Sequence, residues 1–145
     1  MRFSKTEKKR QSVDNAYVID SFALLAHMEG EVRGKKVTEI LKKAQAGKVS
    51  LYMSVINLGE VYYIIMRERG REKADEVLML TEQLPIKIVD VDRDLTISAA
   101  KLKAQHPVAY ADCFASALAV GKNIKIITGD PEFKKFEKEV KILWI

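Results

Sequence analysis

Four acidic residues stand out because almost all of their neighbours in the sequence are uncharged. Asp112 is the only charged residue in PVAYADCFASALAVG, and Glu60 is the only one in SVINLGEVYYIIM. Asp20 follows the short apolar run AYVI, and Asp130 lies in the turn-like segment TGDP. A buried carboxylate is costly unless a cation, hydrogen-bond donors or a metal ion offset its desolvation. These four residues are therefore the first candidates for a functional site.

The chemistry that such carboxylates favour is metal binding. No lysine or arginine lies between Lys103 and Lys122, so Asp112 has no basic partner nearby in the sequence. Four carboxylates gathered without a counter-ion would repel one another, and several of their pKa values would rise. Oxygen ligands without histidine suit Mg²⁺ or Mn²⁺ rather than zinc. Two such ions about 4 Å apart can activate water and stabilise both oxygens of a phosphoryl displacement.

Short apolar runs alternate with helical patterns along the chain. Strands are expected at Ala16–Ile19, Val49–Met53, Ile86–Val89, Ile124–Ile127 and Lys141–Trp144. Helices are expected at Ser21–Met28, Lys35–Gln45, from Ser54 as N-cap to about Arg69, at Arg71–Leu84, Arg93–Gln105 and around Asp112. Apolar strands indicate a sheet covered on both faces, so we expect a three-layer α/β/α fold with a mostly parallel sheet of about five strands. Ligands of such sheets bind at the carboxyl ends of the strands, where Asp20 and Asp130 would lie.

Composition narrows the class of protein further. The 145 residues suit one domain, and no uncharged run approaches the roughly 20 apolar residues of a membrane helix, so we expect no membrane contact. A single cysteine, Cys113, and the lack of an apolar signal core favour the cytoplasm. Residues 1–12 contribute +4 of the net charge of +5. We expect a flexible basic tail over residues 1–13, able to contact phosphates or merely solubilising, and a folded domain over residues 14–145.

The acidic residues also carry a family resemblance. YVIDSFALLA, SVINLGEVYY, AYADCFASALA and IITGDPEF are similar, in this order, to the four acidic motifs of the PIN domain family. The resemblance runs from about Val13 to the C-terminus, and it is greatest to the VapC-type toxin ribonucleases of toxin–antitoxin pairs. It implies an endoribonuclease that depends on Mg²⁺ or Mn²⁺, with RNA as substrate and an antitoxin protein as partner. The residues that it implies as catalytic and metal-binding are Asp20, Glu60, Asp112 and Asp130, with Thr128 supporting them by hydrogen bonding.

Other interpretations stay open at this point. Asp20 and Asp112 would also serve as helix caps, Glu60 as a surface residue and Asp130 as a turn residue. A PIN-type RNA-maturation nuclease or an inactive PIN-like scaffold would have the same motifs. A receiver-type signalling domain also places acids at strand ends, but it needs an acidic pair where this chain has Asp20 and Ser21, and a lysine after the fifth strand.

Partner surfaces are less clear from the sequence. The helix expected after Ser54 has more apolar residues than one buried face requires, and the surplus could line an antitoxin groove or a homodimer contact. That surplus is Tyr62, Tyr63, Ile64 and Met66. Cations near the acidic residues would be needed to hold RNA phosphates. The candidates are Arg67, Arg69, Arg71, Lys122, Lys134 and Lys135.

Overall fold

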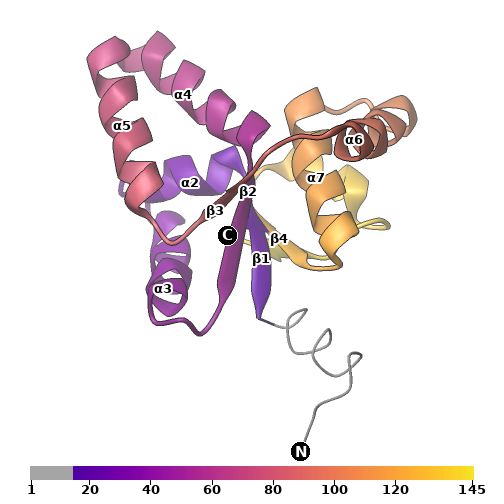
Figure 1. Cartoon of the computed structure of the whole chain (residues 1–145), viewed down its shortest axis with the longest axis horizontal. Coiled ribbons are helices and arrows are strands. Elements are labelled where there is room, and N and C mark those ends of the chain that lie inside the picture. Colours follow the sequence, from indigo (N-terminus) through magenta and orange to yellow (C-terminus); the bar gives the residue numbers. More distant parts are fainter. Residues whose placement is uncertain (1–14) are drawn as a thin grey trace, which may run out of the picture.

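The computed structural model describes residues 15–145, which form a parallel five-stranded sheet with helices on both faces (Figure 1). The strand order is β3-β2-β1-β4-β5, and every neighbouring pair is parallel. The strands are β1 (Ala16–Ile19), β2 (Ser50–Ser54), β3 (Lys87–Val89), β4 (Lys125–Thr128) and β5 (Ile142–Trp144). The predicted three-layer α/β/α fold is confirmed, with strand ends within one residue of those expected.

The helices form two layers whose cores are separated by the sheet. The first layer contains α2 (Ser21–Met28), α3 (Gly34–Gln45), α4 (Val55–Arg69) and α5 (Arg71–Gln83). The second contains α6 (Arg93–Gln105) and α7 (Tyr110–Lys122). Successive strand residues serve opposite layers: Ile19 packs with the first, whereas Val18 packs with the second. Both faces of the sheet are therefore buried, which explains the apolar strands.

Three helices begin directly after a strand or after the loop that follows one. A side chain caps the N-terminus of each of them. Asp20, Ser54 and Asp92 accept hydrogen bonds from backbone N–H groups in the first turns of α2, α4 and α6. Because the sheet is parallel, these caps all lie toward the carboxyl ends of the strands. The N-termini of α2, α4 and α6 are thereby fixed along one edge of the sheet.

Two segments differ from the sequence-based expectation. The helix around Asp112 begins at Tyr110, because Pro107 is followed by a tight turn in which the Val108 amide donates to the His106 carbonyl at 2.9 Å. A 3₁₀ helix, η1 (Pro131–Phe136), follows the predicted turn at Asp130 and was not expected. Its Phe133 and Phe136 are fully buried in the second layer.

The predicted basic tail, residues 1–13, lies outside the described residues. Within residues 15–145, no helix is both long and apolar enough to cross a membrane. The single cysteine, Cys113, is buried in α7, as its place in an apolar helix predicts.

Helix α3 approaches α2 so closely that its first residue must be glycine. A Cβ on Gly34 would lie 2.3 Å from the carbonyl oxygen of Ala26, a backbone atom that cannot move aside. We predict that Gly34→Ala lowers the free energy of unfolding by about 1–3 kcal/mol. Gly121→Ala is the matched control, since nothing lies within 4 Å of its Cβ and the change should stabilise α7 by up to about 1 kcal/mol. Chemical denaturation measures both, and equal effects would contradict this packing.

Candidate active site

Asp20 lies in the deepest part of the acidic group, at the carboxyl end of β1. It is 1% exposed, and its Oδ1 accepts a hydrogen bond of 2.8 Å from the Ala23 amide. Its Oδ2 accepts a hydrogen bond from the Thr128 hydroxyl at the end of the neighbouring β4. The predicted supporting contact of Thr128 is therefore present. Thr128 Oγ1 in turn accepts from the Asp130 amide at 3.0 Å, so the turn of Asp130 is tied to Asp20.

Glu60 joins the first helical layer to the same edge of the sheet. It is half-buried on α4, and its Oε1 accepts a hydrogen bond from the hydroxyl of Ser21 on α2. Ser21 immediately follows Asp20, so this bond brings the Glu60 carboxylate next to the residue beside Asp20. The surface interpretation of Glu60 is therefore not supported.

Asp112 enters from the other side of the sheet, in the first turn of α7. It is 7% exposed, and within the described residues no basic side chain pairs with it. Helices α4 and α7 meet here, because Asn57 Nδ2 donates to the Ala111 carbonyl at 3.2 Å. Asn57 is fully buried, and its Oδ1 has no hydrogen-bond partner among the described residues. A buried oxygen without a donor is costly, and it lies one helical turn from Glu60.

The carboxylates affect one another's ionisation. Burial raises the pKa of Asp20 to about 8, and the negative charges of Asp112 and Asp130 add to the rise. The hydrogen bonds from Thr128 and Ala23 oppose it, because they stabilise the ionised carboxylate. Burial likewise raises the pKa of Asp112 to about 7, with further contributions from the charges of the other acids. Those acids are Asp130, Glu60 and Glu132. The structure thus brings all four predicted residues to one edge of the sheet.

Glu132 is an acidic residue of this group that sequence reasoning missed. It lies in the first turn of η1, where its amide donates to Asp130 Oδ1 at 3.0 Å and its Oε2 accepts from Lys135 Nζ at 3.0 Å. Nothing in TGDPEF distinguishes it from an ordinary exposed glutamate. Only the 3₁₀ turn after Pro131 brings it near Asp112.

The oxygen atoms of these side chains are suitable ligands for a hard divalent cation. In this structure, however, the carboxylates accept hydrogen bonds from neighbouring residues. Within residues 15–145, no three His, Cys, Asp or Glu side chains are placed so as to hold one ion together. The Asp20 and Glu60 carboxylates instead accept hydrogen bonds from Thr128 and Ser21. The oxygens of the acidic group and the unpartnered Oδ1 of Asn57 are all of the kind that Mg²⁺ and Mn²⁺ prefer. An ion would have to replace some of these hydrogen bonds.

The cations suggested for RNA binding are mostly engaged elsewhere. Lys135 pairs with Glu132 beside the acidic group, whereas Arg69 pairs with Glu29. Arg71 pairs with Asp75, and the Arg67 guanidinium lies 5.2 Å from the centre of the Tyr63 ring. Lys122 is the last residue of α7, ten residues beyond Asp112 and hence about 15 Å along the helix. The expectation that Lys122 lies near the acidic residues is therefore wrong.

The raised pKa values predict how stability depends on pH without metal. Between the usual pKa of 3.8 and about 7–8, the folded state holds protons on Asp112 and Asp20 that the unfolded chain has lost. The metal-free protein should therefore lose stability as pH rises from about 5 to about 8. Asp112→Asn should reduce this loss and be as stable as wild type or more so at the higher pH.

Thermal denaturation of the metal-free protein across this pH range measures the effect. The control is Glu82→Gln, which changes an exposed acid on α5 and should leave the pH dependence as in wild type. A wild-type stability that rises over this interval would contradict the electrostatic account.

Comparison with known proteins places this geometry in a family. A PIN domain family model matches residues 17–139. Among solved structures, VapBC2 from Rickettsia felis bound to a promoter DNA fragment is similar with a TM-score of 0.69 and 16% identity, covering 88% of this chain and 97% of that one. VapC20 from Mycobacterium tuberculosis, a Sarcin-Ricin loop cleaving toxin, gives 0.63 and 18%, with 87% and 96% covered. FitAcB from Neisseria gonorrhoeae gives 0.64 and 16%, with 88% and 96% covered. No curated protein matches the chain. Since the family model spans most of the sequence, this chain belongs to the PIN domain family.

Proposed function

We propose that this protein is a metal-dependent endoribonuclease and the toxin of a toxin–antitoxin pair. The observation that carries the proposal is the meeting of Asp20, Glu60, Asp112 and Asp130 at the carboxyl edge of the sheet, where each residue enters from a different element. The family membership and the toxin complexes among the similar structures support it. We propose all four carboxylates as metal ligands, with Mg²⁺ or Mn²⁺ as the ion.

In this proposal, the chain's own residues hold a group of carboxylates ready for the ion. A bound Mg²⁺ or Mn²⁺ would activate water and stabilise the charge that develops on the phosphate. Thr128 holds the Asp20 carboxylate in one orientation, and Ser21 does the same for Glu60. Asn57 fixes α4 against α7, and this contact sets the separation of Glu60 from Asp112. At pH 7 without metal, the raised pKa values of Asp20 and Asp112 keep protons on this site.

Two alternatives share the fold and differ in biology. An RNA-maturation nuclease would have the same acidic residues, and a neighbouring small antitoxin gene separates that role from a toxin. An inactive scaffold would keep the fold without cleaving RNA.

The receiver-type alternative is excluded by the family match. As part of the proposal, the single cysteine, Cys113, which is buried, supports a reducing compartment such as the cytoplasm.

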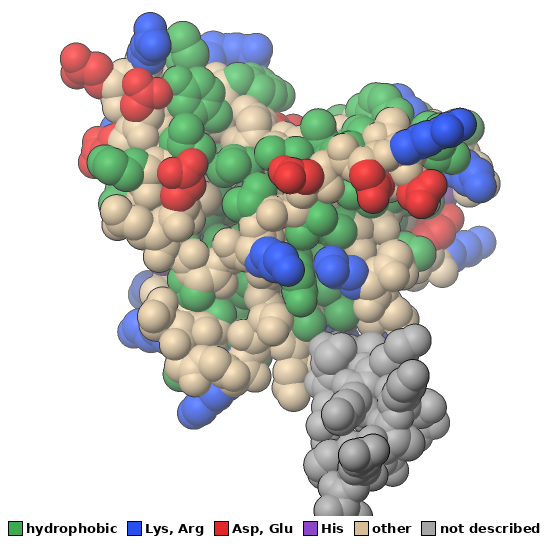
Figure 2. All heavy atoms as spheres, viewed as in Figure 1, with side chains coloured by type: hydrophobic (Ala, Val, Ile, Leu, Met, Phe, Trp, Pro, Cys, Tyr) green, Lys and Arg blue, Asp and Glu red, His purple; other side chains and the backbone are tan. Residues whose placement is uncertain are grey.

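An exposed apolar surface on α4 and α5 supports a protein partner. Tyr63 and Met66 on α4 are 47% and 44% exposed, and Met79 and Leu80 on α5 are 56% and 42% exposed. Figure 2 shows hydrophobic side chains gathered over these two helices. Of the other apolar residues expected there, Tyr62 donates its hydroxyl to Asp75 and Ile64 is half-buried. We propose that this surface contacts an antitoxin or a second copy of the chain.

Metal-dependent cleavage tests the enzymatic proposal. Purified protein should cleave structured RNA with Mg²⁺ or Mn²⁺ and stop when EDTA is added. Asp112→Asn should lower the cleavage rate by at least about 100-fold, because even residues that only support metal ligands typically contribute roughly 10–100-fold. Glu82→Gln, an exposed change of the same kind, should keep wild-type activity. Cleavage that persists in EDTA, or an active Asp112→Asn protein, would sink the metal mechanism.

Association tests the partner surface. Met66→Lys places a charge on the exposed apolar part of α4 and should weaken self-association or antitoxin binding at least tenfold, because the charge would be desolvated in the contact. Analytical ultracentrifugation measures self-association, and titration with the antitoxin measures antitoxin binding. Gln83→Lys, at the exposed end of α5, is the control. If Met66→Lys changes neither, the α4–α5 surface is not the contact.

A further inference from the structure

The amino-terminal edge of the sheet, opposite to the acidic residues, is basic. Lys87 is the first residue of β3, Lys125 is the first of β4, and Lys141 directly precedes β5. All three are exposed. Since every strand is parallel, the three lysines emerge along one edge. Lys122, at the C-terminal end of α7, joins them there.

One group of these residues lies on the face of the sheet that α6 and α7 cover. The strand register pairs Tyr52 of β2 with Lys87 of β3, so both side chains leave the sheet on the same side. Lys122 approaches the same ring, with its Nζ 4.3 Å from the centre of Tyr52. One lysine therefore lies over this half-buried tyrosine, and a second is its neighbour on the adjacent strand. Figure 2 shows two basic side chains close together over this lower part of the sheet.

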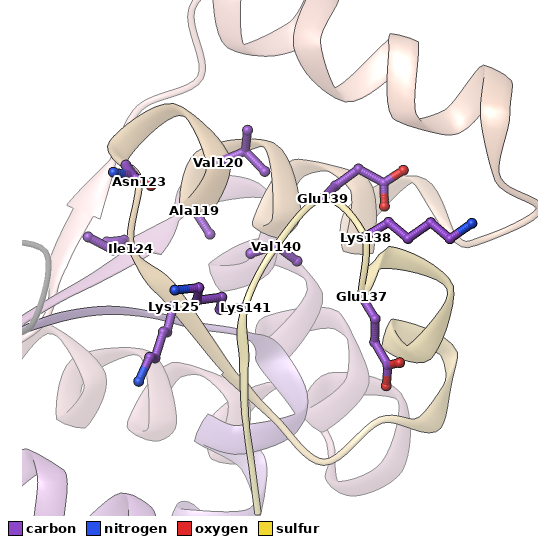
Figure 3. Close-up of a pocket in the computed structure, with 10 residues that line it drawn as sticks. All are labelled: Ala119, Val120, Asn123, Ile124, Lys125, Glu137, Lys138, Glu139, Val140 and Lys141. Atoms are coloured by element: carbon purple, nitrogen blue, oxygen red, sulfur yellow. The ribbon is translucent and has the colours of Figure 1, made fainter.

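A second group lies on the opposite face and has the same composition. The register pairs Tyr17 of β1 with Lys125 of β4, and the pairing of Ile126 with Ile142 makes Lys141 the next neighbour. Lys125 and Lys141 therefore stand side by side on strands about 4.8 Å apart. Both residues also line a cavity of about 430 Å³, which lies between the end of α7 and the segment that leads into β5 (Figure 3).

These positive charges are not neutralised within residues 15–145. None of the four lysines forms an ion pair with a described residue. Of the two acids that line the cavity, Glu139 already accepts a hydrogen bond from His106 at 2.8 Å. Like charges close together on a sheet repel one another. A polyanion bound across the edge would reduce the repulsion between Lys87 and Lys122 and that between Lys125 and Lys141.

We propose that this basic edge binds the phosphate backbone of RNA. The inference rests on the proposed ribonuclease function and adds a second contact region for its substrate. Lysines hold phosphates without sequence preference, so such an edge would bind many RNA sequences. The edge lies about 15 Å from Asp112, the length of α7 between Asp112 and Lys122. It therefore holds RNA beyond the cleavage point and contributes affinity rather than chemistry.

The test compares two double variants of the full chain that remove the same charge. Lys87→Gln with Lys125→Gln removes one lysine from each group, whereas Lys35→Gln with Lys101→Gln removes two exposed lysines from α3 and α6. Binding of a long single-stranded RNA is measured in EDTA over a range of salt concentrations. The edge variant should bind about tenfold more weakly, with a salt slope smaller by about 1.4. The control should bind as wild type does.

Cleavage and DNA-binding measurements distinguish a failure of this inference from a failure of the proposed ribonuclease function. Cleavage at saturating RNA should be the same in the edge variant as in wild type, because no acidic residue is touched. Equal binding and equal salt slopes in the two double variants would overturn the inference while leaving the ribonuclease intact. Loss of duplex DNA binding with unchanged RNA binding would also overturn it. Wild-type protein that binds RNA at this edge but never cleaves it with Mg²⁺ or Mn²⁺ would overturn the proposed function alone.

Discussion

The hydrogen bond between Thr128 and Asp20 joins the ends of two central strands around a carboxylate that is almost completely buried. Burial works against ionisation there, and the neighbouring acids add to that effect. The surrounding structure offsets only part of the cost, through the amide of Ala23 and the hydroxyl of Thr128. We propose that a bound cation would offset the rest of this cost.

The parallel sheet gives this protein two chemically different edges. Acids from β1, α4, α7 and the turn after β4 meet at the carboxyl edge, and lysines gather at the amino edge. Helix α7 spans the distance between them, with Asp112 in its first turn and Lys122 at its end. An RNA that reaches both edges would place phosphates on lysines while one phosphodiester lies at the acids.

Most of the fold could be predicted from sequence because its signals are local. The apolar strands, Ser54 as a cap and Gly70 after α4 each determine structure through immediate neighbours. The candidate acids were also recognisable, since a lone charge such as Asp112 or Glu60 contrasts with its apolar surroundings. Glu132 and the lysines of the amino edge could not be recognised in this way. Their positions near other charged residues depend on a 3₁₀ turn and on strand register. The position of Lys122 was mistaken although the sequence contains the reason: it lies ten residues beyond Asp112 on one helix, hence about 15 Å away.

The central claim is that the gathered carboxylates form a binding site for a divalent cation. Calorimetric titration of Mn²⁺ into the metal-free protein at pH 7, in two buffers of different ionisation enthalpy, tests it most directly. With pKa values of about 8 for Asp20 and about 7 for Asp112, saturable binding should release between about one and two protons per molecule. Absence of saturable binding, or binding with the same heat in both buffers, would contradict the claim.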